Sequence, residues 1–127
     1  MRNIEKEITA AKLLSGLVDL ADITENGIIA IDSESNLIVM NKTAEKILGI
    51  DAKEGIGKNL SQILSNPELM DTLKTGEIQK NRRMDIGERT IITNRMPITS
   101  GDESIGAIAI FHDMTEHYNL LKDFHNE

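Results

Sequence analysis

Residues 104–116 (SIGAIAIFHDMTE) constrain the fold most, because an apolar strand there runs without a loop into the start of a helix. Side chains alternate between the two faces of a strand. Both faces of this strand are largely apolar: one carries Ile105, Ala107, Ala109 and Phe111, and the other carries Gly106, Ile108 and Ile110. The pattern predicts a strand that is covered on both sides.

The strand ends in Asp113-Met114-Thr115, which has the features of a helix start. The Asp113 carboxylate can accept a hydrogen bond from the first free backbone N–H groups of a helix, and Glu116 stands where a capping-box acid would reach back. Apolar residues then recur at helical spacing up to Phe124. Three interpretations of this amphipathic helix stay open. It continues in a longer protein, it pairs with a second copy, or it folds back onto the chain's own sheet.

The composition narrows the functional classes. The chain has 127 residues, enough for one domain with one hydrophobic core. It contains no cysteine, so disulfides, thiolate nucleophiles and cysteine metal sites are excluded. A formal net charge of −7 argues against direct nucleic-acid contact, which needs a concentrated basic surface. No apolar run approaches the roughly 20 residues that span a bilayer, and no signal peptide is recognisable. We therefore expect a cytoplasmic protein without membrane contact.

Apolar periodicity and turn residues predict the other elements. Residues 3–21 form an amphipathic helix with these apolar positions: Ile4, Ile8, Ala11, Leu14, Leu17, Val18 and Ala21. Strands are expected at residues 28–32, 37–40, 77–85, 88–98 and 104–112, and short helices at 42–48, 60–64 and 67–75. Asn41 caps the first short helix, and Pro67 opens the third.

This order predicts an α+β domain, in which a five-stranded antiparallel sheet carries short helices on one face and amphipathic helices at both ends. The strand at residues 88–98 has two unlike faces. One carries Thr90, Ile92, Asn94, Met96 and Ile98, and the other carries Arg89, Thr93 and Arg95. We assign the more apolar face to the interior, where the apolar faces enclose a small volume.

The order of elements and several motifs resemble the PAS domain family over residues 22–116. The hairpin NGIIAIDSESNLIVMN is similar to the family's opening strands, and Asn41-x-x-Ala44 to its first helix. Gly57-Lys58-Asn59-Leu60 resembles the approach to the second helix. The closing strands and the Asp-x-Thr link are similar to those of cytoplasmic PAS domains in bacterial sensor histidine kinases and enhancer-dependent transcriptional activators.

The resemblance implies an organisation and a mechanism. Residues 1–21 would be a dimerisation helix, residues 22–116 the PAS domain and residues 117–127 the start of an output helix. The last strand would be central in the sheet. A change in the cavity would pass through Asp113, Thr115 and Glu116 into the output helix, which would control a downstream kinase or transcription-activator domain.

The resemblance also argues against two cofactors. In the photosensing flavin subfamily a cysteine follows the Gly-x-Asn motif, but here Leu60 follows it, so a flavin–cysteine adduct cannot form. Haem-binding members place an axial histidine on the helix that corresponds to residues 67–75, which has none. The histidines match no familiar metal-ligand spacing, so no metal is expected. The cofactor remains unknown.

Three functions stay open. The leading hypothesis is a two-component sensor domain that binds a small non-covalent ligand in this pocket: Ile29, Ile31, Leu69, Met70, Leu73, Thr90, Ile92, Asn94, Met96, Ala107 and Ala109. Thr90 and Asn94 would be its polar handles. The second is a ligand-free dimerisation and coupling module. The third is a small enzyme, but no catalytic residues can be assigned and we do not expect enzymatic activity.

Overall fold

The fold is organised by one antiparallel sheet. The computed structural model describes the backbone of residues 2–65 and 67–125, and the side chains of residues 12–65 and 67–122. The strands are β1 (Asn26–Asp32), β2 (Leu37–Met40), β3 (Gln79–Ile86), β4 (Arg89–Ser100) and β5 (Glu103–Asp113). Their order in the sheet is β2-β1-β5-β4-β3. The predicted α+β class is confirmed, and β5 lies in the centre of the sheet.

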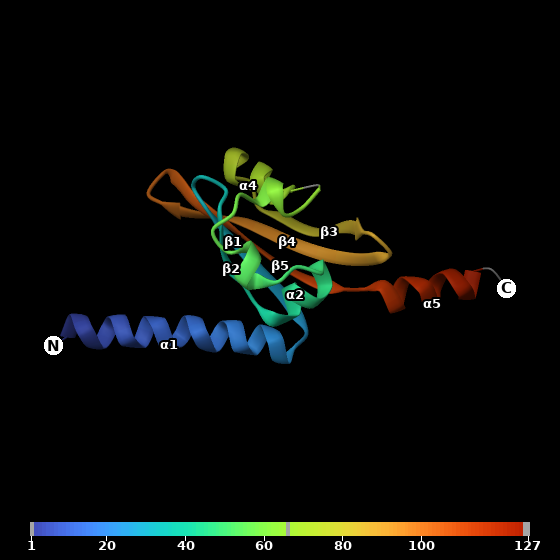
Figure 1. Cartoon of the computed structure of the whole chain (residues 1–127), viewed down its shortest axis with the longest axis horizontal. Helices are drawn as coiled ribbons and strands as arrows, with labels where there is room; N and C mark the ends of the chain where they lie inside the picture. The colour runs from blue at the N-terminus through green and yellow to red at the C-terminus, as the bar shows by residue number, and fades with distance from the viewer. Residues whose placement is uncertain (1, 66, 126–127) are drawn as a thin grey trace.

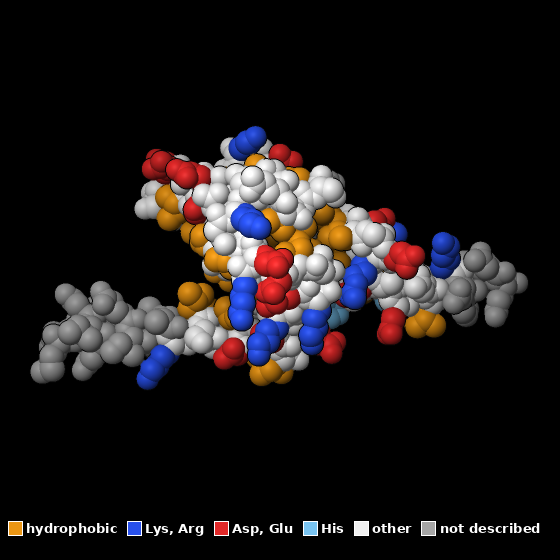
Figure 2. All heavy atoms as spheres, in the orientation of Figure 1, with side chains coloured by type: hydrophobic (Ala, Val, Ile, Leu, Met, Phe, Trp, Pro, Cys, Tyr) orange, Lys and Arg blue, Asp and Glu red, His pale blue; other side chains and the backbone are white. Residues whose placement is uncertain are grey.

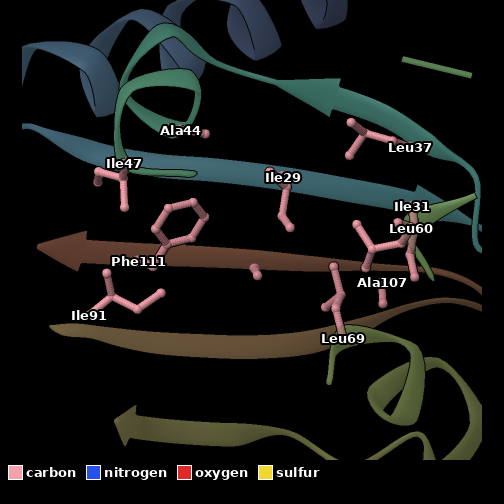
Figure 3. Packing of buried hydrophobic residues seen from close by; sticks show 11 residues of the cluster. Ile29, Ile31, Leu37, Ala44, Ile47, Leu60, Leu69, Ile91, Ala107 and Phe111 are labelled. Atoms are coloured by element: carbon pink, nitrogen blue, oxygen red, sulfur yellow. The ribbon is translucent and has the colours of Figure 1, made fainter. Parts of the chain in front are cut away.

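Four short helical segments lie between β2 and β3 in the chain. They are α2 (Lys42–Leu48), α3 (Ala52–Gly55), the 3-10 helix η1 (Leu60–Gln62) and α4 (Leu69–Thr75). They cover one face of the sheet, which we call the inner face (Figure 1). Figure 3 shows the core between the two layers, with Ile29 and Phe111 from the sheet and Leu60 and Leu69 from the helical layer.

Some predicted helix boundaries were wrong for local reasons. The third short helix begins at Leu69 and not at Pro67, because the Pro67 carbonyl accepts a hydrogen bond from Met70 N–H and closes a turn ahead of the helix. The helix predicted at residues 60–64 is a single 3-10 turn. α3 was missed, although Asp51 caps it by accepting a hydrogen bond from Lys53 N–H.

The two terminal helices, α1 (Arg2–Ile23) and α5 (Thr115–His125), extend away from the domain in different directions (Figure 1). α1 is attached at its C-terminal end, where Ala21 is buried and the Asp22 carboxylate accepts hydrogen bonds from the Thr43 N–H and hydroxyl. No helix among the described residues is long and apolar enough to cross a membrane.

Within one copy of the chain, one face of β5 is covered by the short helices and the other is partly exposed. Phe111 and Ala107 face the helices and are buried, whereas Ile110, on the other face, is 40% exposed. This other face, which we call the outer face, carries an open groove of about 320 Å³ over β1, β3, β4 and β5. Its apolar lining includes Ile28, Ile78, Met96, Ile108 and Ile110.

A substitution at Gly106 of β5 would test how closely β5 packs against β1. A Cβ at this position would lie 2.5 Å from the Ile31 carbonyl oxygen, a backbone atom that cannot move aside alone. Gly106→Ala is expected to lower the free energy of unfolding by about 1–3 kcal/mol in urea denaturation. The matched change Gly16→Ala, on α1 where a Cβ meets no atom within 4 Å, should leave it equal or raise it. Equal stability of both variants would contradict this packing.

Candidate functional site

The pairing of β4 with β5 determines which β4 side chains reach the interior. Thr93 lies opposite Phe111, and Arg95 lies opposite Ala109. Phe111 and Ala109 face the short helices, so Thr93 and Arg95 do as well. Both are buried, with 2% and 3% of their surface exposed.

The predicted pocket therefore needs a correction. Side chains alternate between the two faces of β4, and Thr93 and Arg95 take the inner face. The outer face therefore carries Thr90, Ile92, Asn94 and Met96. Met96 is 49% exposed and Asn94 lines the outer groove. Neither predicted polar handle reaches the interior. Asn94 accepts a hydrogen bond from Asn81 N–H on β3, and the Thr90 hydroxyl donates one to Asp85.

The other predicted pocket residues do lie on the inner side. Ile29, Leu69 and Ala109 line an internal cavity between the sheet and α4. Ile31 and Ala107 belong to the same buried cluster, and Met70 and Leu73 pack against it. Sequence reasoning missed the remaining lining residues: Leu48, Leu64, Glu68, Met84, Ile86, Ile91, Thr93, Arg95 and Phe111. The strand register was the signal that could have found those on β4.

The internal cavity is small. Its volume is about 30 Å³, which accommodates roughly one or two water molecules. Pockets for small molecules are typically about 300–1,000 Å³. A ligand could therefore enter only if the surrounding side chains or α4 moved.

The polar part of the cavity wall is built around Arg95. Its guanidinium donates one hydrogen bond from Nη2 to Glu68 Oε2 at 2.7 Å and another from Nη1 to Gln79 Oε1 at 2.6 Å. Glu68 precedes α4, and its side chain is 39% exposed, whereas that of Arg95 is 3% exposed. A buried cation is thus held by a carboxylate that reaches the solvent.

A second polar network joins β5 to α5. Asp113 Oδ1 accepts hydrogen bonds from the Thr115 N–H at 2.9 Å and from the Thr115 hydroxyl. The Thr115 Oγ1 accepts a hydrogen bond from Thr90 N–H, and Met114 N–H donates to the Thr90 carbonyl. Arg89 Nη1 donates to Asp113 Oδ2 at 2.9 Å. The start of α5 is therefore tied to β4 as well as to β5.

The predicted junction residues were Asp113, Thr115 and Glu116, and the first two belong to this network. Asp113 and Thr115 interact directly, as the Asp-x-Thr motif implied. Glu116 is exposed, and within the described part of the chain its carboxylate makes no hydrogen bond that would close a capping box. Partial burial raises the pKa of Asp113, but the hydrogen bonds from Thr115 and the nearby Arg89 guanidinium outweigh this effect, so its pKa lies below its ordinary value.

The predicted dimer helix can be checked only in part. The side chains of Ile4, Ile8 and Ala11 lie outside the described residues. Leu14 and Leu17 are 59% and 53% exposed, and Val18 is partly buried. Figure 2 shows hydrophobic side chains at the surface where α1 meets the domain. Among the described residues, no group of three or more histidine or acidic side chains could hold a metal ion.

The comparison with protein families identifies the class. The model of the PAS fold matches residues 14–114, so the chain belongs to the PAS family. Solved structures with a similar fold agree with this family. The PAS domain of Bordetella pertussis BvgS covers 91% of this chain and 96% of its own at 22% identity, with a TM-score of 0.59. Histidine kinase ThkA, solved with response regulator protein TrrA, covers 76% of this chain and 31% of its own at 20% identity, with a TM-score of 0.66.

The curated relatives are sensor kinases. The Halalkalibacterium halodurans protein named Probable C4-dicarboxylate sensor kinase is 33% identical over 97 residues, which are 76% of this chain and 18% of that kinase. Signal transduction histidine-protein kinase AtoS of Escherichia coli is 30% identical over 125 residues, which are 91% of this chain and 20% of AtoS. The chain spans about a fifth of the length of these relatives. It is a PAS domain homologous to those of bacterial sensor histidine kinases.

The lowered pKa of Asp113 predicts a specific pH dependence. Because its pKa is lower in the folded than in the unfolded chain, its ionised form stabilises the fold above about pH 4, and this contribution is lost as the pH falls through the folded-state pKa. Asp113→Asn should therefore reduce the free energy of unfolding at pH 7, by less than about 1 kcal/mol for this partly exposed ion pair. The deficit should shrink by pH 3 in urea denaturation.

Asp102→Asn, in an exposed turn, is the matched control and should show no such trend. A deficit for Asp113→Asn that was the same at pH 7 and pH 3 would show that the ionised carboxylate does not stabilise the fold.

Proposed function

We propose that this chain is the cytoplasmic regulatory PAS domain of a bacterial sensor histidine kinase. In this role it takes a small non-covalent ligand into its inner cavity and passes the resulting change through α5 to a kinase domain. The domain itself performs no catalytic step. The proposal is supported by the homology to sensor kinases over most of this chain.

The single observation that carries the proposal is the network at Asp113. Thr90 and Arg89 of β4 are both hydrogen-bonded to the β5–α5 junction. The inner cavity is lined by residues of the same two strands, among them Arg95 and Ala109. A displacement of β4 relative to β5 would therefore change the orientation of α5, which is the coupling that a relay domain requires.

A second candidate, the ligand-free coupling module, is favoured by the size of the cavity. A volume of about 30 Å³ leaves no room for a metabolite without rearrangement. In that case the same junction would transmit changes that arrive from α1.

We further propose that the domain works as a homodimer through α1. Four leucines on this helix, Leu13, Leu14, Leu17 and Leu20, are each more than half exposed. Such a stripe on a helix that projects from its domain is stabilised when a partner helix covers it. A second copy is the simplest partner, because each copy presents the same surface.

The relay can be tested in a chimera. Residues 1–127 would replace the matching segment of the Halalkalibacterium halodurans kinase, which is 18% of its length, and autophosphorylation would be measured with and without a C4-dicarboxylate, which we expect the rest of that kinase to sense. We expect the chimera to respond. Asp113→Ala should reduce the response by about fivefold or more, which is a typical coupling between sites. Loss of the cap should reduce stability by only about 0.5–2 kcal/mol, so that the fold is retained.

Asp102→Ala serves as the control and should respond like the unmodified chimera. If Asp113→Ala and Thr115→Ala both responded normally, the junction would not be a relay. Unfolding of Asp113→Ala would instead assign a structural role to this residue.

The dimer can be tested by light scattering after size exclusion. The chain of residues 1–127 is expected to run as a dimer, and Leu14→Glu/Leu17→Glu as a monomer, because two carboxylates would be buried in the helix interface. Lys12→Glu, at an exposed position of the same helix, should remain dimeric. An unchanged dimer after removal of residues 1–21 would exclude α1 from the interface.

A further inference from the structure

The inner cavity has an unusual charge arrangement for a space of its size. Its wall is mainly apolar, with Ile29, Ile91 and Phe111 among the lining residues, yet it contains the Arg95 guanidinium. Arginine remains protonated in proteins, so it cannot become neutral to reduce the cost of burial. The cation must therefore always have an anionic or strongly polar partner on the inner side of the sheet.

Glu68 supplies that partner in the closed domain. Its Oε2 lies 2.7 Å from Arg95 Nη2, and it lies just before α4 rather than on the sheet. The two charges have unequal access to water: the Glu68 side chain is 39% exposed and that of Arg95 is 3% exposed. Glu68 can leave the pair and be hydrated, whereas Arg95 cannot follow it.

The buried Arg95 therefore determines which kind of ligand could replace Glu68. Removal of Glu68 without replacement would leave the buried cation with the neutral Gln79 amide but without a carboxylate, which is unfavourable. A ligand that carries a carboxylate would restore the pair, because the planar guanidinium matches two carboxylate oxygens. The space vacated by the Glu68 carboxyl group, together with the cavity of about 30 Å³, would accommodate only a short molecule.

The apolar part of the cavity wall determines which groups the ligand can carry beyond its carboxylate. Apart from Glu68, Thr93 and Arg95, the residues that line the cavity are apolar. An aliphatic tail would be covered by side chains such as Leu69 and Phe111. A second carboxylate would lie among these apolar groups without a cation to pair with it.

We propose that Arg95 is the recognition group for a short-chain organic monocarboxylate, and that Glu68 occupies its place in the ligand-free domain as a built-in competitor. The inference rests on the proposed role of the inner cavity as a ligand site. It assigns to Glu68 a second role, because exchange for the ligand would remove the Glu68–Arg95 contact between the start of α4 and β4.

The experiment is a titration of the 127-residue chain with butyrate, followed by NMR chemical shifts at constant ionic strength set with sodium chloride. Butyrate should bind saturably. Glu68→Gln should bind it about tenfold more tightly or better, because the amide competes less well for a charged hydrogen bond. Arg95→Met should bind it at least about tenfold more weakly. Arg83→Met, an exposed arginine of β3, is the matched control and should bind like wild type.

Two further ligands test the chemistry. Neutral 1-butanol has the same tail without the charge, and succinate adds a second carboxylate; both should bind at least about tenfold more weakly than butyrate. If Arg95→Met does not fold, Arg95→Lys keeps the charge without the planar fork and should weaken binding of butyrate. Binding only in Glu68→Gln, and only with Arg95 present, would also support the proposal.

Several results would overturn it. One is the absence of butyrate binding in both wild type and Glu68→Gln while both are folded. Equal binding of 1-butanol would reveal an apolar cavity without charge recognition, and equal or tighter binding of succinate would contradict the monocarboxylate class. An unchanged affinity in Glu68→Gln would reduce the ion pair to a structural contact. None of these results affects the Asp113 relay, which is measured separately by the response of the chimera.

Discussion

The antiparallel pairing of β4 with β5 decides which side chains face the short helices. Arg95 lies opposite Ala109, so its guanidinium enters the interior while Met96 faces outward. Since a buried cation requires partners, Glu68 before α4 and Gln79 on β3 are both held against Arg95. One register thus joins the sheet to α4 and determines the charge of the cavity.

The same strand also contacts the start of α5. The backbone of Thr90 exchanges hydrogen bonds with Thr115 Oγ1 and Met114 N–H, and Arg89 pairs with Asp113. Arg95 contacts the cavity from the inner face of β4 a few residues further along. Energetic coupling needs a physical element that both sites bias. β4 supports the proposed relay because it contacts both sites: Arg89 and Thr90 at its start meet the β5–α5 junction, and Arg95 in its middle lines the cavity.

The fold could be predicted from the sequence because its elements carry strong local signals. The hairpin at β1 and β2, the Asn41 cap and the Asp113 helix start all depend on neighbouring residues. The cavity wall could not be predicted from β4 alone, because the more apolar face of that strand lies outward. Hydrophobic alternation assigned Ile92 and Met96 to the interior, whereas the pairing with Phe111 and Ala109 places Thr93 and Arg95 there. A long-range constraint overrode the local pattern.

The small cavity and the buried ion pair together limit how strongly a ligand could act. A ligand shifts a conformational equilibrium only by the difference between its affinities for the two states. Exchange of the Glu68 carboxylate for another carboxylate is nearly balanced at Arg95, because similar charge-assisted hydrogen bonds are lost and formed. The driving force must then come from the tail, where burial of about three methylene-sized groups contributes about 2 kcal/mol. An exchange of this kind favours weak, reversible binding, so the occupancy of the cavity would follow the concentration of the carboxylate.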